Sequence, residues 1–543
     1  MPRFPRLGGK RATLVVLGAA VFGLLWLFPR TKADANDAPP EPGEIDVRPN
    51  QTQGAISPLI YGMGLEWVEN GNRILDPGTG RLRPEVLRLL SPLHIPVWRF
   101  PGGILADYYS WRDGVGPRES RPKRENPMDG SVHENNFGTD EFINLCRSLG
   151  SEALVTANYG TGSLADTLAW QQYFLNHKFP VRYWEVGNEI YLTESSKNAN
   201  IRGNDARIFH NATDYAKAFH EWSHALRAAD SDALVGAIAG TREHTSSQHR
   251  DWLDVLLSSA GHDVDFIALH NAFAPMIFGA YDYRDPEKRS DAYRAMWTQP
   301  LFSGEDTRTV RDRFRDAHAD APSRIAITEH FPLFGGGGPK DQILSILDQS
   351  RTLAAALYTA ALLHTFMREK VWMANYNVAT SKWFGALLTD TDSGLIRTPT
   401  YYLYDLYRNH FGGTLVEASV HSPVYSSGRV GGVPRRNIVP YLDAVASTDN
   451  AGGIYLAVIN RHLDRPIEAT VRVAGLAPGA APADVYTLNG ATPNSINGPP
   501  LTQTVAGGSP ENVEIKHTSW TTDDLKYRFP AHSLTILQWQ TQP

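Results

Sequence analysis

The sequence contains very little cysteine: Cys146 is the single one among 543 residues. A lone thiol excludes an intrachain disulfide, so the fold must depend on its hydrophobic core. Cys146 lies in the segment FINLCRSLG, on the apolar face of an expected helix. Its simplest interpretation is a small buried hydrophobe.

An excess of charge of one sign is also missing. The formal net charge is −6 and 20% of the residues are charged, so the chain has no basic surplus with which to hold nucleic acid. We expect no nucleic-acid partner. Histidines 244, 249, 330 and 364 lack the clustered spacing of a metal site, and we expect no catalytic metal and no cofactor.

Low-complexity tracts are absent, and 42% of the residues are hydrophobic, which is typical of a folded globular protein. A chain of 543 residues predicts two or three domains. The 13 Trp and 22 Tyr residues supply many flat apolar faces that suit sugar rings, although most are expected in the core.

The N-terminus is a separate unit. Arg3, Arg6, Lys10 and Arg11 precede an uncharged apolar run over residues 12–28, the pattern of an export signal. We expect residues 1–35 to be a signal peptide or an uncleaved membrane anchor, followed by a proline-rich linker over 36–44. The rest of the chain is then periplasmic or extracellular.

Short β-rich runs alternate with longer helical patterns over residues 57–411, which favours βα units around a parallel sheet. Eight strands of this kind over such a span predict an α/β fold of the (β/α)8 TIM-barrel type. A doubly wound open sheet is the alternative, but no glycine-rich phosphate turn follows the first strand. The expected strands are Leu59–Leu65, Ile95–Phe100, Ala153–Ala157, Val181–Val186, Leu234–Ala239, Val264–His270, Arg324–Glu329 and Val371–Tyr376; the expected helices are Asp140–Leu149, Leu164–Asn176, Thr213–Ala229, Arg250–Ser259 and Arg351–Glu369.

Helical patterns stop after residue 411, where short alternating strands separated by Gly, Pro, Asn and Asp take over. Residues 412–543 therefore predict an antiparallel, jelly-roll-like β-sandwich domain. The strand-like segment over 45–56 is expected to join that sandwich, so that both ends of the chain fold together.

Catalytic groups of a TIM barrel lie at the C-terminal ends of its strands. The fourth and seventh expected strands end in VRYWEVGNEIY and RIAITEHFPLF, and each places a glutamate there, Glu189 and Glu329. Two opposed carboxyl groups are what glycosidic cleavage requires, one to protonate the leaving oxygen and one to attack the anomeric carbon. The alternative is that both are ordinary loop-end glutamates.

The segments around these glutamates resemble a known group of enzymes. WEVGNE at 184–189 and the strand ending in Glu329 are similar to the acid/base and nucleophile motifs of clan-A retaining glycoside hydrolases. IYGMGLEW at 60–67, VWRFPGGILADYYSWRDGVGPRESRP at 97–122 and FIALHNAFAP at 266–275 resemble segments of the α-L-arabinofuranosidase family, glycoside hydrolase family 51. PYLDAVAST, VINRH and FPAHSLTIL resemble pieces of its C-terminal sandwich.

The resemblance implies roles for individual residues: Glu189 as acid/base, Glu329 as nucleophile and Glu66 as a substrate-binding carboxylate. Arg99, at the end of the second strand, can hold the nucleophile ionised, and Asn188 can bond the 2-hydroxyl of the sugar. His270 can bond a sugar hydroxyl or Glu329. Aromatic candidates for the wall of the cleft are Trp383, Tyr281, Tyr283 and Trp297, each of which can equally be ordinary packing.

The chain departs from the family at Ile104 and Phe273, where polar side chains are common, and the nucleophile lies in TEHF in place of a DEWN-like context. Three functions follow for a polysaccharide or oligosaccharide partner. The first is removal of α-L-arabinofuranosyl units by a retaining enzyme. The second is endo-acting hydrolysis of a β-glucan, xylan or exopolysaccharide, and the third is an inactive carbohydrate-binding envelope protein.

Overall fold

The computed structural model describes residues 41–126, 130–193, 210–240, 250–277, 285–318, 322–334, 347–382, 385–479, 481–501 and 512–540. The expected signal or anchor over 1–35 lies outside these residues. Among the residues described, no helix combines the length and the apolar character needed to cross a membrane.

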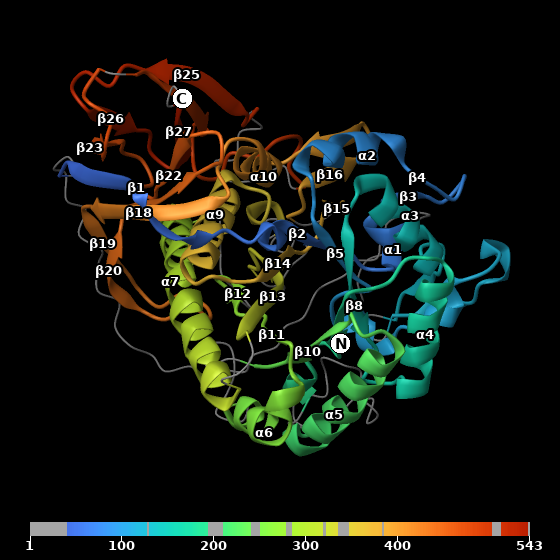
Figure 1. Ribbon diagram of the computed structural model, residues 1–543. Helices are drawn as coiled ribbons and strands as arrows, with labels where there is room; N and C mark the ends of the chain where they lie inside the picture. Colours follow the sequence, from blue (N-terminus) through green and yellow to red (C-terminus); the bar gives the residue numbers. More distant parts are fainter. Residues whose placement is uncertain are drawn as a thin grey trace.

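Eight parallel strands close into a barrel at the centre of the molecule (Figure 1). Strand β14 pairs with β2 through Asn375 and Gly62, and β11 pairs with β13, so the sheet has no free edge. The TIM-barrel prediction is confirmed. The strands are β2 (Gly62–Gly64), β5 (Val97–Phe100), β8 (Glu152–Ala157), β9 (Tyr183–Val186), β10 (Leu234–Ile238), β11 (Phe266–Ala268), β13 (Arg324–Phe331) and β14 (Met373–Tyr376).

Helices surround the barrel, and several begin at side-chain caps. Ser163 and Thr352 each accept a hydrogen bond from a backbone N–H in the first turn of the helix that follows. The helices are α1 (Val68–Asn72), α2 (Pro84–Leu90), α3 (Thr139–Leu149), α4 (Leu164–Asn176), α5 (Ala212–Ala229), α6 (Arg250–Ala260), α7 (Pro286–Ala317), α9 (Leu353–Arg368) and α10 (Pro399–Asn409).

The long helix α7 was not predicted. Its sequence is rich in charged residues and carries Pro300 in its interior, which removes one helical hydrogen bond. Helix α7 packs along α9, and this packing buries residues such as Met296 and Trp297 completely. Tertiary packing therefore overrides a weak local preference.

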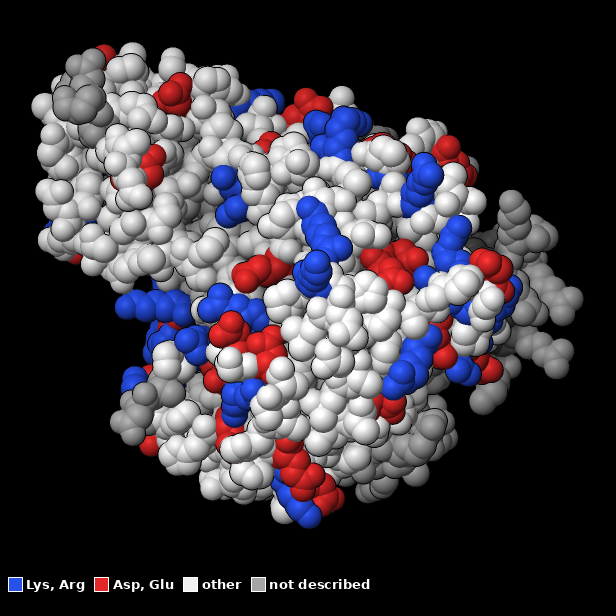
Figure 2. Space-filling model, turned by 45° about the vertical axis from the view of Figure 1, so that its right-hand side comes forward, with Lys and Arg blue, Asp and Glu red and all other residues white. Residues whose placement is uncertain are grey.

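Several short strands lie outside the eight strands of the barrel. Two are pairs, β3 (Leu75–Asp76) with β4 (Arg81–Leu82) and β6 (Lys123–Glu125) with β7 (Val132–Glu134). A three-stranded sheet is formed by β15 (Thr380–Ser381), β16 (Leu388–Thr391) and β17 (Gly394–Arg397), and β12 (Ala272–Phe273) extends the barrel sheet beside β13. On the face shown in Figure 2, basic and acidic side chains are interspersed.

The C-terminal strands form one nine-stranded sheet that curls over itself. Its first and last strands meet, because the ring of Trp520 in β25 lies 5.3 Å from that of Tyr527 in β26. The strands are β1 (Gly43–Ala55), β18 (Thr414–His421), β21 (Leu442–Thr448), β22 (Gly453–Asn460), β23 (Ile467–Val473), β24 (Ala483–Leu488), β25 (Ile515–Trp520), β26 (Lys526–Phe529) and β27 (Ser533–Gln540), with β19 (Val424–Ser427) and β20 (Arg436–Pro440) as a separate pair.

Strand β1 brings the two ends of the chain together. It pairs antiparallel with β18 and parallel with β23, and Figure 1 shows it in blue beside the orange β18. Along β22, Leu456 and Val458 belong to the core of the sandwich, whereas Ala457 and Ile459 belong to the core of the barrel. The two domains thus share a continuous apolar contact, with α9 packed against β21, β22 and β27.

A buried charge cluster stands at this contact. Asp443 of β21 accepts a hydrogen bond from Arg461 at 2.6 Å and another from Arg368 of α9, and the side chains of Asp443 and Arg461 are buried. Burial alone would raise the pKa of Asp443, but Arg368 and Arg461 beside it hold that pKa well below its usual range.

Replacing Asp443 by Asn should lower the free energy of unfolding by about 3–5 kcal/mol, because it leaves the buried Arg461 guanidinium without a counter-charge. The native pKa is depressed, so the wild-type advantage is complete above the unfolded pKa of about 4 and declines as the pH falls below it. Denaturant unfolding of the wild type and the variant at pH 7 and pH 3 measures the loss of unfolding free energy and its dependence on pH. The exposed pair of Asp484 and His517 supplies the control, and an Asp443→Asn loss no larger than that of Asp484→Asn would contradict the prediction.

Candidate active site

The two strand-end glutamates lie at the same mouth of the barrel. Glu189 follows β9 and Glu329 lies within the C-terminal part of β13, and their exposed fractions are 7% and 5%. Glu189 has a φ of 43°, in the left-handed region that non-glycine residues rarely adopt. Such strain costs on the order of 1–3 kcal/mol and concentrates at functional sites.

Arg99 connects three groups of the site. Its Nη1 donates to Glu329 Oε2 at 3.0 Å, its Nη2 to Asn188 Oδ1 at 2.7 Å, and its Nε to Glu185 Oε2 at 2.8 Å. The guanidinium is 1% exposed. Charge-assisted bonds of this kind are among the strongest in proteins, so Arg99 fixes both the Glu329 carboxylate and the Asn188 amide.

His270 makes the corresponding contacts with the other glutamate. Its Nδ1 lies 2.9 Å from Glu189 Oε1, and its Nε2 lies 3.0 Å from the hydroxyl of Thr328. The Thr328 hydroxyl donates in turn to Glu185 Oε1 at 2.6 Å. A single chain of hydrogen bonds therefore runs from Glu329 through Arg99, Glu185, Thr328 and His270 to Glu189.

Glu329 accepts a further hydrogen bond at Oε1, from Asn377 Nδ2 at 3.3 Å. Burial raises the pKa of the Glu329 carboxyl and nearby Glu189 adds to the rise, while neighbouring His270 and Arg99 lower it. The two glutamates are therefore close enough to influence each other's ionisation.

A third carboxyl group lies beside this pair. Glu66 follows β2, is 2% exposed, and accepts a long hydrogen bond of 3.4 Å from Asn72 Nδ2. Burial, reinforced by the charge of Glu329, raises its pKa to about 8, so Glu66 is protonated at neutral pH and can donate a hydrogen bond. Gly103 is required alongside it, because a Cβ there would lie 2.7 Å from Glu66 Oε1 and φ is 62°.

Replacing Glu66 by Gln should raise the melting temperature, and raise it more at pH 8 than at pH 5. The folded chain keeps the Glu66 proton up to about pH 8, whereas the unfolded chain releases it near pH 4.3. The wild type therefore loses stability as the pH rises between these values, and a neutral amide does not. Melting curves of both proteins between pH 5 and pH 8 provide the measurement. A difference in melting temperature between variant and wild type that does not change with pH would contradict the prediction.

Similar proteins share both halves of this architecture. A family profile described as "Alpha-L-arabinofuranosidase 1 domain" matches residues 89–177, and one described as "Alpha-L-arabinofuranosidase C-terminal domain" matches residues 340–533. A probable α-L-arabinofuranosidase C from Aspergillus terreus is 28% identical over 94% of this chain and 99% of its own length. An intracellular exo-α-L-arabinofuranosidase from Bacteroides ovatus is 26% identical over 91% and 95% of the two chains.

A solved family 51 α-L-arabinofuranosidase from Thermotoga petrophila superposes with a TM-score of 0.73 and 25% identity, over 92% of this chain and all of that one. The chain is an α-L-arabinofuranosidase-like glycoside hydrolase, similar to the enzymes of family 51. As such, this hydrolase is a retaining enzyme that acts on a carbohydrate, as its sequence predicts.

The structure brings five further predicted positions of the hydrolase to one place. Glu66, Arg99, Asn188, His270 and Phe273 all lie buried at the mouth of the barrel around the two glutamates. The ring of Phe273 meets that of His270 edge to face at 6.1 Å. The expected contact of His270 with Glu329 is not the one observed: its Nδ1 lies 2.9 Å from Glu189 Oε1, and its Nε2 is occupied by the Thr328 hydroxyl.

Of the four aromatic residues predicted to line the cleft, the structure describes only Trp297. Trp297 is fully buried in α7 and donates its Nε1–H to Ala354 of α9 at 2.9 Å, so for this residue packing is the correct interpretation. The other three candidates, Trp383, Tyr281 and Tyr283, lie outside the described residues. Cys146 is buried, as expected.

Sequence reasoning missed two groups that hold the site together. Glu185 is fully buried inside the barrel and also accepts a hydrogen bond from the Thr156 hydroxyl at 2.8 Å. Asp107 accepts bonds from the backbone N–H groups of Asn188 and Gly160, both at 3.2 Å. A charged residue inside an otherwise apolar strand such as YWEV is the one feature that indicates a buried partner.

Proposed function

We propose that the hydrolase removes α-L-arabinofuranosyl units from a polysaccharide or oligosaccharide, with Glu329 as nucleophile and Glu189 as acid/base. The observation that carries the proposal is the hydrogen-bonded chain at the barrel mouth. It places a cationic guanidinium on Glu329 and an imidazole on Glu189, so that the two carboxyl groups meet different surroundings. Different surroundings are what separate an acid from a nucleophile.

In the first step, Glu189 donates its proton to the glycosidic oxygen while a carboxylate oxygen of Glu329 bonds to the anomeric carbon and the C–O bond breaks. In the second step, Glu189 removes a proton from water, which attacks the anomeric carbon and releases Glu329. Arg99 and Asn377 keep the Glu329 carboxylate in place for both attacks. This route predicts carboxyl groups about 5–5.5 Å apart.

The neighbouring groups contribute to sugar binding in this proposal. Arg99 occupies Oδ1 of Asn188, which orients the N–H groups of the amide for a sugar hydroxyl such as the 2-hydroxyl. Protonated Glu66 supplies a donor beside the nucleophile. Bonds to hydroxyls that strengthen as the ring becomes oxocarbenium-like accelerate cleavage.

The second candidate, an endo-acting hydrolase of β-glucan, xylan or exopolysaccharide, is favoured by Ile104 and Phe273. Both side chains are buried at the mouth and offer no hydrogen bond to a sugar. Purified protein should be incubated with aryl glycosides and with polysaccharides. We expect rapid hydrolysis of the aryl α-L-arabinofuranoside, with release of the phenol. Shortening of a polymer without aryl hydrolysis would establish the endo-acting candidate instead. No turnover of any substrate would favour a binding protein.

Replacing Glu185 by Gln should lower kcat by about 100-fold with little change in KM. The substitution removes the charge to which Arg99 Nε and the Thr328 hydroxyl are bonded, and misplacing catalytic groups by about 1 Å has an effect of this size. Steady-state kinetics on the aryl substrate and a pH–rate profile provide the test. Glu152, which bonds Tyr183 at the opposite end of β8, gives the control Glu152→Gln; equal losses in both variants, or a lower melting temperature with unchanged kcat, would leave Glu185 a merely structural role.

We also propose that the hydrolase is exported through its N-terminal apolar segment, as a periplasmic or extracellular enzyme that is either released or anchored. The Bacteroides ovatus relative is named as intracellular, so the proposal concerns this chain's own leader. Fractionation of cells that express the full chain, with and without residues 1–35, tests it: activity confined to the cytoplasm in both cases would be decisive against export.

A further inference from the structure

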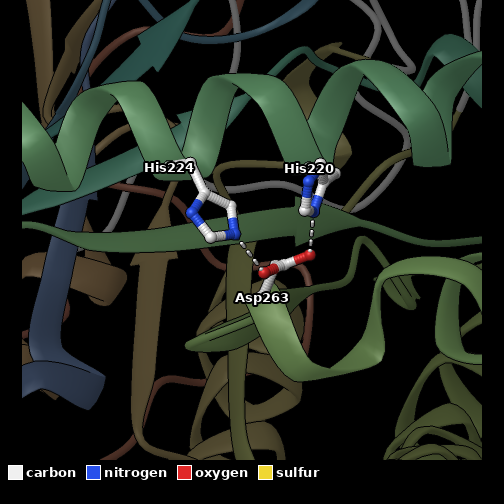
Figure 3. A group of neighbouring side chains, drawn as sticks. All are labelled: His220, His224 and Asp263. Atoms are coloured by element: carbon white, nitrogen blue, oxygen red, sulfur yellow. Dashed lines mark hydrogen bonds and ion pairs between the residues drawn. The ribbon is translucent and has the colours of Figure 1, made fainter.

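Away from the catalytic mouth, three potential metal ligands converge on the surface of the barrel. His220 and His224 lie one turn apart on α5, and Asp263 lies in the short 3-10 helix over Gly261–Asp263. Figure 3 shows the Asp263 carboxylate between the two imidazole rings. His220 Nδ1 lies 2.7 Å from Oδ2, and His224 Nε2 lies 2.8 Å from Oδ1.

We propose that His220, His224 and Asp263 form a binding site for a divalent transition-metal ion, with Zn²⁺ as the expected occupant. Two imidazoles and one carboxylate, with water in the fourth position, are a ligand set that Zn²⁺ accepts in tetrahedral geometry. The ligand atoms all lie within 4.8 Å of one another. Ligand atoms about 2.0–2.1 Å from one ion stand roughly 3.4 Å apart in a tetrahedron, a spacing that rotation of the three side chains can reach.

The carboxylate is held in place before any ion binds. Both Nη atoms of Arg227 donate to the backbone carbonyl of Asp263, at 3.1 and 3.0 Å, and Asp263 is 14% exposed at its side chain. The two histidine side chains are 57% and 61% exposed, so they are free to rotate toward an ion that arrives from solvent. The positive charge of Arg227 is offset by Asp265, which it bonds at 2.7 Å.

The position of the cluster assigns it a structural role. Asp263 lies three residues before the start of β11, and α5 ends shortly before β10 begins, so the cluster is placed toward the N-terminal end of the barrel strands. That end of a TIM barrel serves stability, whereas catalysis occupies the other. An ion here would join α5 to the segment before β11, which belongs to the next βα unit.

Titration calorimetry of metal-free full-length protein with ZnCl₂ tests the site. We expect one saturable binding event whose affinity falls at least about 10-fold in His220→Ala and in His224→Ala, because losing a ligand costs no less than losing an outer-shell partner. His517→Ala is the matched control, because His517 is an exposed histidine paired with a single aspartate, Asp484, at 3.0 Å. This control should bind Zn²⁺ as the wild type does.

The affected ligands are exposed, so the variants should fold, and unchanged turnover and unchanged melting temperature without metal verify that they do. At Zn²⁺ concentrations about 100-fold above the wild-type Kd, the wild type should melt about 2–3 °C higher than without metal, and the His220→Ala and His224→Ala variants should show about half of this shift or less. Zn²⁺ binding that is equal in the wild type and in both variants, or no saturable binding to the wild type, would overturn the proposal.

Discussion

Replacing Glu329 by Ala is expected to abolish turnover of every glycoside, activated or natural. The variant has no carboxylate to form the covalent intermediate, and loss of a covalent nucleophile costs on the order of 10⁶-fold in other hydrolases. Steady-state rates on an aryl glycoside measure the loss. Glu152→Ala, at the opposite end of the barrel, should retain wild-type activity.

Azide provides a second readout for the same variant. The alanine leaves space on the face from which Glu329 attacks, and Glu189 still protonates the leaving group. Azide should therefore displace the leaving group directly and yield a glycosyl azide of inverted configuration, identified by NMR. A rescued product of retained configuration would mean that Glu329 is not the nucleophile.

Replacing Glu189 by Ala is expected to reduce turnover according to the leaving group. General acid–base help contributes about 10²–10⁴-fold, and natural linkages need all of it because an alkoxide leaves poorly without a proton. An aryl glycoside carries a phenolate that leaves unaided, so the glycosyl-enzyme should form in a rapid burst. Pre-steady-state release of the phenol measures this burst.

The second step then limits the Glu189 variant, because no base activates water. Azide needs no base, so it should restore turnover of the aryl substrate and yield a glycosyl azide of retained configuration, after two displacements at the same carbon. Inverted product would show that the two glutamates have exchanged roles. A loss independent of the leaving group would contradict an acid role for Glu189.

Local sequence determined the architecture of the barrel. Runs of β-branched and aromatic residues alternate with helical periods, and each of the eight expected strands overlaps an observed one. Strand seven continues past its expected end to Phe331, and strand one shortens to Gly62–Gly64 because the turn over Pro58–Tyr61 replaces its first half. Strand order along the chain was enough to direct attention to Glu189 and Glu329, since parallel strands of a barrel end at one mouth.

Only the tertiary structure decided which groups meet. The two-residue period of a strand indicates on which face Glu185 lies, but its bonds to Arg99, Thr156 and Thr328 depend on neighbouring strands far away in the chain. The same holds for β1, which pairs with β18 more than 300 residues later, and for Asp263, which meets two histidines of α5. Secondary-structure preference depends on residues that are neighbours in the sequence. These contacts instead arise from closure of the barrel and docking of the sandwich.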